Sequence, residues 1–104
     1  MENSKLTIIT QVNEQSVSFE AAGYIAYDTA VQFENALMDS FQYDPENITV
    51  DMSNVAVFTS IGIRVILKVY KAAKEKGVGF QIENPSSTVR KVLNLSKLDI
   101  MLLK

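Results

Sequence analysis

The chain contains no cysteine, no histidine and no tryptophan among its 104 residues. Without cysteine it forms neither disulfides nor thiolate metal sites, and without histidine it has no zinc site of the usual ligand types and no histidine-based catalytic triad. We therefore expect no bound metal and no cofactor. These two absences exclude more classes of function than any motif in the sequence supports.

Long apolar runs are also missing. No segment approaches the ~20 apolar residues that a membrane helix needs, and residues 1–5 lack the basic and then apolar pattern of a secretory signal. We therefore expect a soluble, cytoplasmic protein that does not insert into a membrane. With 47% hydrophobic residues, the chain is long enough to bury one core and too short for two. We predict a single domain over residues 1–104.

The net charge is only −2, but the charges are divided unevenly along the chain. Residues 1–58 carry nine acids and one base, whereas residues 59–104 carry nine bases and three acids. Either the two halves interleave in the fold and their charges offset each other, or a basic face is left to meet an acidic partner. Because no aromatic stacking platform or recognised binding motif accompanies the bases, we expect no direct contact with nucleic acid.

Alternating apolar residues predict strands in the first half of the chain. Residues 6–12 and 17–21 alternate on either side of the turn-prone stretch 13–15, which indicates a β-hairpin with one buried face, ending at Gly23. Residues 48–52 form a short strand without the polar face of a surface hairpin, so we place it centrally in a sheet.

A first helix is predicted to begin at Thr29, because apolar residues then recur at helical spacing. Thr29 and Gln32 are placed as a capping box. The helix should stop near Tyr43, since the residue before Pro45 disfavours the α conformation.

A second helix is predicted between Ser60 and Gly77, with Gly77 as its C-terminal stop. One set of its residues follows the i, i+3, i+4, i+7 rule and should face the core: Ile63, Ile66, Leu67, Tyr70 and Ala73. Charged residues make the opposite stripe: Arg64, Lys68, Lys71 and Glu75.

The last part of the chain predicts a strand over residues 78–82 and a third helix capped by residues 84–87, followed by an apolar tail over residues 96–103. The order is therefore β-β-α-β-α-β-α, and the apolar tail at the end could add a short helix or a strand. It predicts an α/β fold with a mixed β-sheet, whose later strands are parallel and whose N-terminal hairpin lies at an edge. The helices should pack mainly on one face.

The stretch "VFTSIGI", residues 57–63, places two hydroxyls between a strand and a helix. Thr59 or Ser60 could serve only as a helix cap, whose side-chain oxygen accepts a hydrogen bond from a backbone N–H. The same helix N-terminus would also stabilise a phosphate. Phosphorylation of Ser60 would then change the surface charge and leave the fold intact.

Two apolar residues flank a glycine at the start of this helix. Ile61 falls beside the polar stripe, so it is either exposed to a partner or folded under the neighbouring loop. Gly62 would either let a partner backbone approach closely or only ease the turn.

Several segments together resemble the STAS domain of bacterial anti-sigma factor antagonists, over nearly the whole chain. Residues 50–55 (VDMSNV) are similar to the family's "vDlSgV" strand, and residues 59–63 (TSIGI) stand where the family has "DSSGL". The resemblance continues through residues 70–74 (YKAAK), Gly77 and residues 84–99 (NPSSTVRKVLNLSKLD), the last similar to "NPSpqVrrlLeltgLd".

The resemblance implies an anti-sigma factor antagonist that binds an anti-sigma factor, itself a serine kinase, and is phosphorylated by it. The family's acceptor is the serine two places before the glycine, which is Ser60 here. The residues expected to bind the partner surround it: Thr59, Ile61, Gly62, Ile63 and Arg64.

Three positions depart from the family pattern. Thr59 replaces an acidic residue, Ile61 replaces a second hydroxyl, and Ala26 stands where the family's "GELD" segment has its Asp. The alternative is therefore a non-phosphorylated STAS interaction subunit of a signalling or transport-ATPase assembly, in which Ser60 is only a cap. We do not expect an enzyme, because Asp28, Asp51 and Asp99 each have a simpler structural role and form no catalytic constellation. The sequence leaves the oligomeric state open.

Overall fold

The computed structural model describes residues 5–103, without the side chain of Ile100. The predicted order of elements is confirmed, and the tail near the end forms a single-turn helix, one of the two predicted alternatives. The structure adds a 3₁₀ helix after the first α-helix. The elements are β1 (Leu6–Val12), β2 (Ser16–Ile25), α1 (Ala30–Asp39), η1 (Ser40–Tyr43), β3 (Asn47–Phe58), α2 (Ser60–Lys76), β4 (Gly79–Glu83), α3 (Ser87–Leu95) and α4 (Asp99–Leu102).

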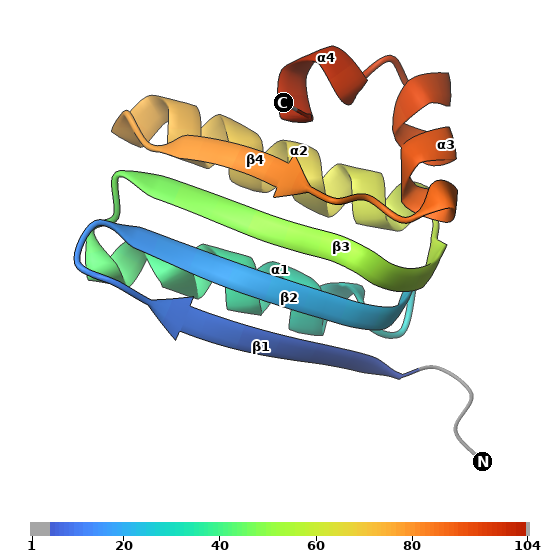
Figure 1. Cartoon of the computed structure of the whole chain (residues 1–104), viewed down its shortest axis with the longest axis horizontal. Coiled ribbons are helices and arrows are strands. Elements are labelled where there is room, and N and C mark those ends of the chain that lie inside the picture. The colour runs from blue at the N-terminus through green and yellow to red at the C-terminus, as the bar shows by residue number, and fades with distance from the viewer. Residues whose placement is uncertain (1–4, 104) are drawn as a thin grey trace.

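The four strands form one mixed sheet in the order β1-β2-β3-β4 (Figure 1). β1 and β2 make the predicted antiparallel hairpin at one edge, and β2-β3 and β3-β4 pair in parallel. The prediction of a central β3 is confirmed, since it has a neighbour on each side. The α/β class with a mixed sheet is confirmed as well.

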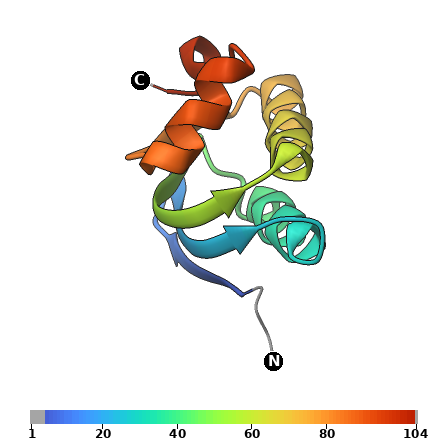
Figure 2. The ribbon, with the colours of Figure 1, turned by 90° about the vertical axis from the view of Figure 1, so that its right-hand side faces the viewer.

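Helices α1 and α2 lie side by side on one face of the sheet (Figure 2). Helices α3 and α4 lie at the end beyond β4, where α3 packs on β3 and α4 on β4 (Figure 1). The other face of the sheet carries mainly polar side chains. Alternate side chains of the strands point toward the helices, as the pleat requires. They form the core with the inward faces of the helices: Val17, Phe19, Ile48, Val50 and Met52 from the strands, and Phe33, Leu37, Ile66 and Val69 from α1 and α2.

Two strands are longer than the sequence indicates. β2 continues through Gly23 to Ile25, because Gly23 adopts φ +108 beside a register shift, a backbone conformation that glycine tolerates. β3 continues from Met52 to Phe58, so Asp51 lies within the strand and not at its end. These extensions carry the sheet directly up to the start of α2.

The capping box predicted for α1 is wrong. Thr29 precedes the helix, but its hydroxyl donates to the carbonyl of Tyr24 at 2.8 Å and accepts from the N–H of Ala26 at 3.0 Å. The Gln32 side chain donates to the carbonyl of Leu6 in β1 at 2.9 Å. Both side chains are therefore engaged outside the helix, Thr29 with the preceding loop and Gln32 with β1.

The buried face of α2 is shifted by one position from the prediction. Ile66 and Ala73 are buried as expected, whereas Ile63, Leu67 and Tyr70 are only half-buried. The row that faces the sheet is Gly62, Val65, Ile66, Val69 and Ala73. Two apolar rows lie next to each other on this helix, and the spacing rule fits both of them. Gly77 ends the helix in the left-handed conformation with φ +73, as predicted.

No helix in the described part of the chain is long and apolar enough to cross a membrane.

Candidate functional site

The tip of α2 is held by backbone hydrogen bonds at the end of β3. The N–H of Thr59 donates to the carbonyl of Ile25 at 3.2 Å, which fixes the tip to the end of β2. The Thr59 carbonyl accepts from the N–H groups of Gly62 at 2.9 Å and Ile63 at 3.3 Å. The N–H groups of Ser60 and Ile61 make no backbone hydrogen bond to the described residues. The tip therefore has a fixed position and free donors.

Neither the Thr59 nor the Ser60 hydroxyl caps α2. Thr59 occupies the N-cap position in an extended conformation, but its side chain makes no capping hydrogen bond. Ser60 is the first helical residue and is exposed, and no hydrogen bond involves its hydroxyl within residues 5–103. In contrast, Ser86 caps α3 as predicted, because its hydroxyl accepts from the N–H of Val89 at 3.2 Å. The cap interpretation thus holds at Ser86 and is wrong at residues 59 and 60.

Gly62 faces the core and not the surface. A Cβ at this position would lie 2.7 Å from Cε1 of Phe58 and 2.9 Å from Cγ2 of Ile25. The space that the glycine leaves is therefore filled by this chain's own side chains. This placement corrects the interpretation that a partner backbone approaches there, and it shows how α2 comes close to the ends of β2 and β3.

Ile61 and Arg64 border an open groove between α1 and α2. Ile61 is half-buried, which lies between the two predicted alternatives, and Arg64 is exposed. The groove has a volume of about 430 Å³, and its α1 side presents Tyr27 and Val31, which are 84% and 68% exposed. The other predicted contact residue, Ile63, packs against the core from the opposite side of the helix.

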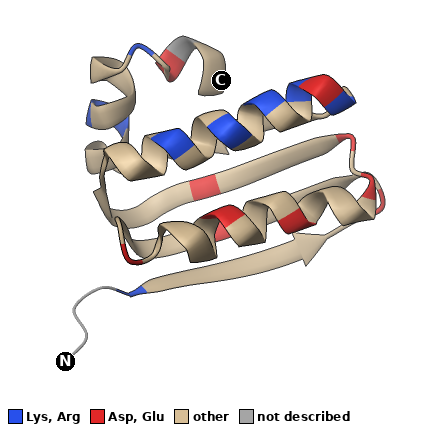
Figure 3. Cartoon of the chain, turned by 180° about the vertical axis from the view of Figure 1, so that it is seen from behind, with Lys and Arg blue, Asp and Glu red and all other residues tan. Residues whose placement is uncertain are grey.

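Charges on the two helices are of opposite sign. The outward face of α2 carries the basic stripe, and acidic residues lie on α1 beside it (Figure 3). Among the described residues the two helices are joined by an ion pair, in which Nζ of Lys68 lies 2.6 Å from a carboxylate oxygen of Glu34. No acidic residue occupies the first turn of α2. Part of the charge is therefore offset between the two halves of the chain, as one interpretation predicted. The other predicted a basic face, and α2 presents one on its outward side.

One polar network was not anticipated from the sequence. The Asp51 carboxylate accepts hydrogen bonds from the Asn84 amide at 2.9 Å, the Ser53 hydroxyl at 2.7 Å and the Ser53 N–H at 2.9 Å. Partial burial raises the pKa of Asp51, but the bonds from Asn84 and Ser53 outweigh it and hold the pKa below its ordinary value. The network joins two segments that resemble the STAS family, residues 50–55 and 84–99.

The same two segments are joined again at Ser86. Its N–H donates to the carbonyl of Met52 at 3.0 Å, and its hydroxyl donates to the carbonyl of Val55 at 2.7 Å. The signal in the sequence was the polar side chains Asp51 and Ser53 within β3 and the polar cluster that follows the end of β4. Their role here is to position α3 against β3.

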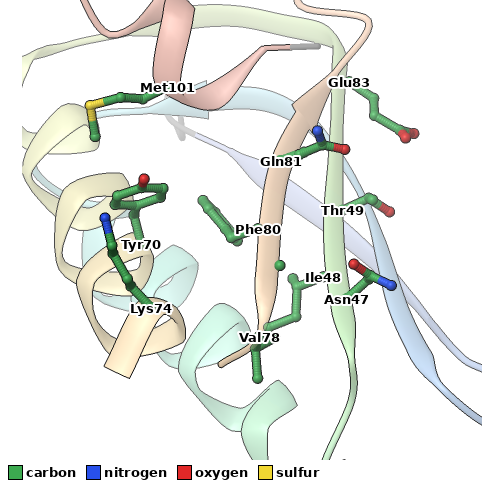
Figure 4. A pocket seen from close by; sticks show the side chains of 11 residues that line it. Asn47, Ile48, Thr49, Tyr70, Lys74, Val78, Phe80, Gln81, Glu83 and Met101 are labelled. Carbon is green, nitrogen blue, oxygen red and sulfur yellow. The ribbon is translucent and has the colours of Figure 1, made fainter. Parts of the chain in front are cut away.

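A second hollow of about 660 Å³ lies along β4, between α2 and α4 (Figure 4). Tyr70 and Lys74 of α2, Phe80 of β4 and Met101 of α4 line it on the helix side. None of these residues was predicted to form a site. No cluster of three or more metal-ligating side chains is present in residues 5–103.

Comparison with known proteins identifies the fold. The family model for the STAS domain matches residues 7–103, which is nearly the whole chain. No curated protein matches the sequence.

Solved structures with the same fold include several anti-sigma factor antagonists. One from Mycobacterium paratuberculosis is 24% identical, with a TM-score of 0.78 over 95% of this chain and 85% of that chain. The antagonist SpoIIAA in its unphosphorylated form is 20% identical, with a TM-score of 0.80 over 94% of this chain and 86% of that chain. The phosphorylated form of SpoIIAA, a Bacillus cell fate determinant, is 19% identical, with a TM-score of 0.75 over 94% and 89%. At these identities the likeness establishes a shared fold.

Proposed function

The chain belongs to the STAS domain family, and on that basis we propose that it is an anti-sigma factor antagonist regulated by phosphorylation at Ser60. In this proposal the unmodified domain binds an anti-sigma factor, itself a serine kinase, through the tip of α2. Phosphorylation of Ser60 then ends the binding. The role is that of a cytoplasmic binding protein, one that regulates transcription without catalysis of its own and without touching nucleic acid.

The observation that carries the proposal is the state of the Ser60 hydroxyl. It is exposed at the first residue of a 17-residue helix, and no described residue binds it. A hydroxyl that capped the helix would instead accept a hydrogen bond from a backbone N–H, as Ser86 does at the start of α3. Since this one is free, a kinase could modify it without breaking any interaction of the fold.

Local charges favour a phosphate at this position. The N–H groups of Ser60 and Ile61 have no partner among residues 5–103, and the positive end of the helix dipole lies at the same place. Arg64 lies one turn further on the same face, at the i+4 spacing that lets side chains meet. A phosphate would add about −1.5 to −2 charges next to the basic stripe and so change the surface offered to a partner.

The residues around Ser60 fit a protein surface. Thr59 and Arg64 are exposed beside it, and Ile61 adds half-buried apolar area next to Tyr27 and Val31. Gly62 supports this surface from below, because its lack of a side chain lets the tip lie close to Phe58.

A second candidate is the fixed interaction subunit, in which Ser60 is never phosphorylated. The apolar groove beside Ile61 favours it, because burying a residue such as Val31 completely contributes about 1.5–3 kcal/mol and stabilises a lasting contact. The absence of an acid at Thr59 and Ala26 points the same way.

The experiment that separates the two candidates combines phosphorylation with binding. The chain is incubated with ATP and the candidate anti-sigma kinases of its source, and mass spectrometry locates any phosphate. Binding to the same kinases is then measured for wild type and for Ser60→Asp. Ser87→Asp is the matched control, because Ser87 is also the exposed first residue of a helix. Both changes place an acid at a helix N-terminus, which is favourable by about 0.3–1 kcal/mol.

The antagonist proposal predicts phosphate on Ser60 alone, loss of kinase binding in Ser60→Asp and unchanged binding in Ser87→Asp. A partner that binds wild type and Ser60→Asp equally well, with no phosphate on Ser60, would instead establish the fixed subunit.

A further inference from the structure

The two edges of the sheet are protected very differently. Beyond β4, Leu103 forms a parallel bridge to Ile82, so part of that edge is occupied. β1 lies at the opposite edge with β2 as its only neighbour among the described strands (Figure 1). Its seven residues, LTIITQV, include no charge, no proline and no glycine. Natural sheets usually protect an exposed edge strand with charged residues or proline. Because β1 has neither, its edge is a template for another strand.

Hydrogen bonds at both ends of the hairpin fix which residues of β1 face outward. The N–H of Tyr24 donates to the carbonyl of Lys5, and the N–H of Asn13 donates to the carbonyl of Ser16, both at 2.8 Å. In an antiparallel ladder the backbone groups of alternate residues point to alternate sides. The odd-numbered residues of β1 therefore bond to β2, and the N–H and C=O groups of Leu6, Ile8, Thr10 and Val12 point away from the sheet.

The first of these outward residues is already engaged. The side-chain amide of Gln32 donates to the Leu6 carbonyl at 2.9 Å. The free template is thus limited to Ile8, Thr10 and Val12. Within residues 5–103, no hydrogen bond involves the outward backbone groups of these three residues.

We propose that the outer edge of β1 pairs antiparallel with β1 of a second copy of this chain, around a two-fold axis at Thr10. In this register Thr10 lies opposite Thr10 of the second copy, and Ile8 lies opposite its Val12. Each of these opposed pairs exchanges two backbone hydrogen bonds, so every free group of the template is used. The register centred on Ile9 would instead require Leu6, whose carbonyl Gln32 occupies.

The side chains of β1 fit this arrangement. In a two-fold interface the residue at the axis meets its own copy, and Thr–Thr is a favourable cross-strand pair where like charges would repel. Ile8 and Val12 form an apolar pair on the helix side, and Val12 is 45% exposed in the single chain. Ile9, which is 54% exposed, lies opposite Gln11 of the second copy on the other face. Pairing therefore covers the apolar residues that β1 leaves in water.

The pairing does not involve the tip of α2. α2 begins at the end of β3, and β2 lies between β3 and β1 in the sheet, so we expect Ser60 and Arg64 to stay accessible in both copies. The dimer is independent of the proposed function. It would present two α2 tips to partners at once.

The test is sedimentation equilibrium of the whole chain from about 10 µM to about 1 mM, the range in which a small interface associates reversibly. Thr10→Pro removes an outward N–H that β2 does not use, and proline is tolerated on edge strands. Thr10→Lys places two like charges at the axis. Thr10→Val keeps the backbone groups and serves as the matched control. Circular dichroism verifies that each variant is folded.

We expect wild type and Thr10→Val to form dimers as the concentration rises, and Thr10→Pro and Thr10→Lys to stay monomeric. In the wild type, amide hydrogen exchange at Ile8, Thr10 and Val12 should slow at the concentrations at which the dimer forms. A wild type that is monomeric throughout, or a dimer that persists in Thr10→Lys, overturns the proposal. If Thr10→Pro fails to fold, Thr10→Lys decides.

Discussion

Replacing Gly62 with alanine should destabilise the protein although it improves helix propensity. Alanine is favoured over glycine within a helix by up to about 1 kcal/mol. The added Cβ would lie 2.7 Å from Cε1 and 2.9 Å from Cδ1 of Phe58, and 2.9 Å from Cγ2 of Ile25. Both neighbours are buried, at 4% and 0% exposure, and cannot move into solvent. Overpacking of this kind costs about 1–3 kcal/mol. We therefore expect a net loss of about 1 kcal/mol.

Thermal unfolding followed by circular dichroism measures this loss. For a chain of about 100 residues, 1 kcal/mol lowers the Tm by about 4–8 °C. The double mutant with Phe58→Leu is the control, because leucine lacks the ring atoms that the new Cβ would meet. In that background Gly62→Ala should cost clearly less, which appears as a coupling free energy in the double-mutant cycle. An unchanged or higher Tm for the single mutant, or no coupling to Phe58, would refute the reasoning.

Three further predictions concern stability, each measured by urea unfolding. Asp51→Asn should cost about 1 kcal/mol near neutral pH, because it weakens the acceptor for Asn84. Since the folded-state pKa of Asp51 is lowered, its contribution is present above the unfolded-state pKa of about 3.9 and is lost as the pH falls through the folded-state pKa. A wild type whose excess stability over Asp51→Asn does not shrink in acid would contradict this. Ser86→Ala should cost about 1–2 kcal/mol, since it removes a helix cap and a bond to β3, and Ser86→Thr should restore part of it. Glu34→Gln should cost under about 1 kcal/mol, because Lys68 is mostly exposed, and a larger loss would show that the pair is not an ordinary surface ion pair.

Most of the fold could be predicted because local patterns and tertiary structure agree. The hairpin, the central strand and the stop of α2 at Gly77 follow from alternation, apolar composition and the left-handed conformation of glycine. The capping prediction failed because both side chains have their partners outside the helix. Thr29 and Gln32 satisfy the local rule for a capping box, yet they bind Tyr24 and Leu6.

The face of α2 could not be predicted for a different reason. Its two adjacent apolar rows have the same helical spacing, and only the sheet decides which row is buried. Gly62 marks the correct row, because the helix comes closest to Phe58 there. From the sequence the third strand is predicted to end at residue 52, whereas β3 continues to Phe58. Without Phe58 in the sheet, nothing indicated that Gly62 faces the core, and a surface role remained open.

The position of Ser60 and the chemistry of its hydroxyl depend on different interactions. Buried contacts of Gly62 and the bond from Thr59 to Ile25 fix where the tip lies. The Ser60 side chain takes part in neither, since it is exposed and unbonded in the described structure. A charge added at Ser60 therefore leaves the tip in place and changes only its surface charge. Changes at Gly62 act in the opposite way, because they displace the tip while its surface chemistry stays the same. Together with the proposed function, this separation predicts loss of partner binding in both Gly62→Ala and Ser60→Asp, with loss of stability in Gly62→Ala alone.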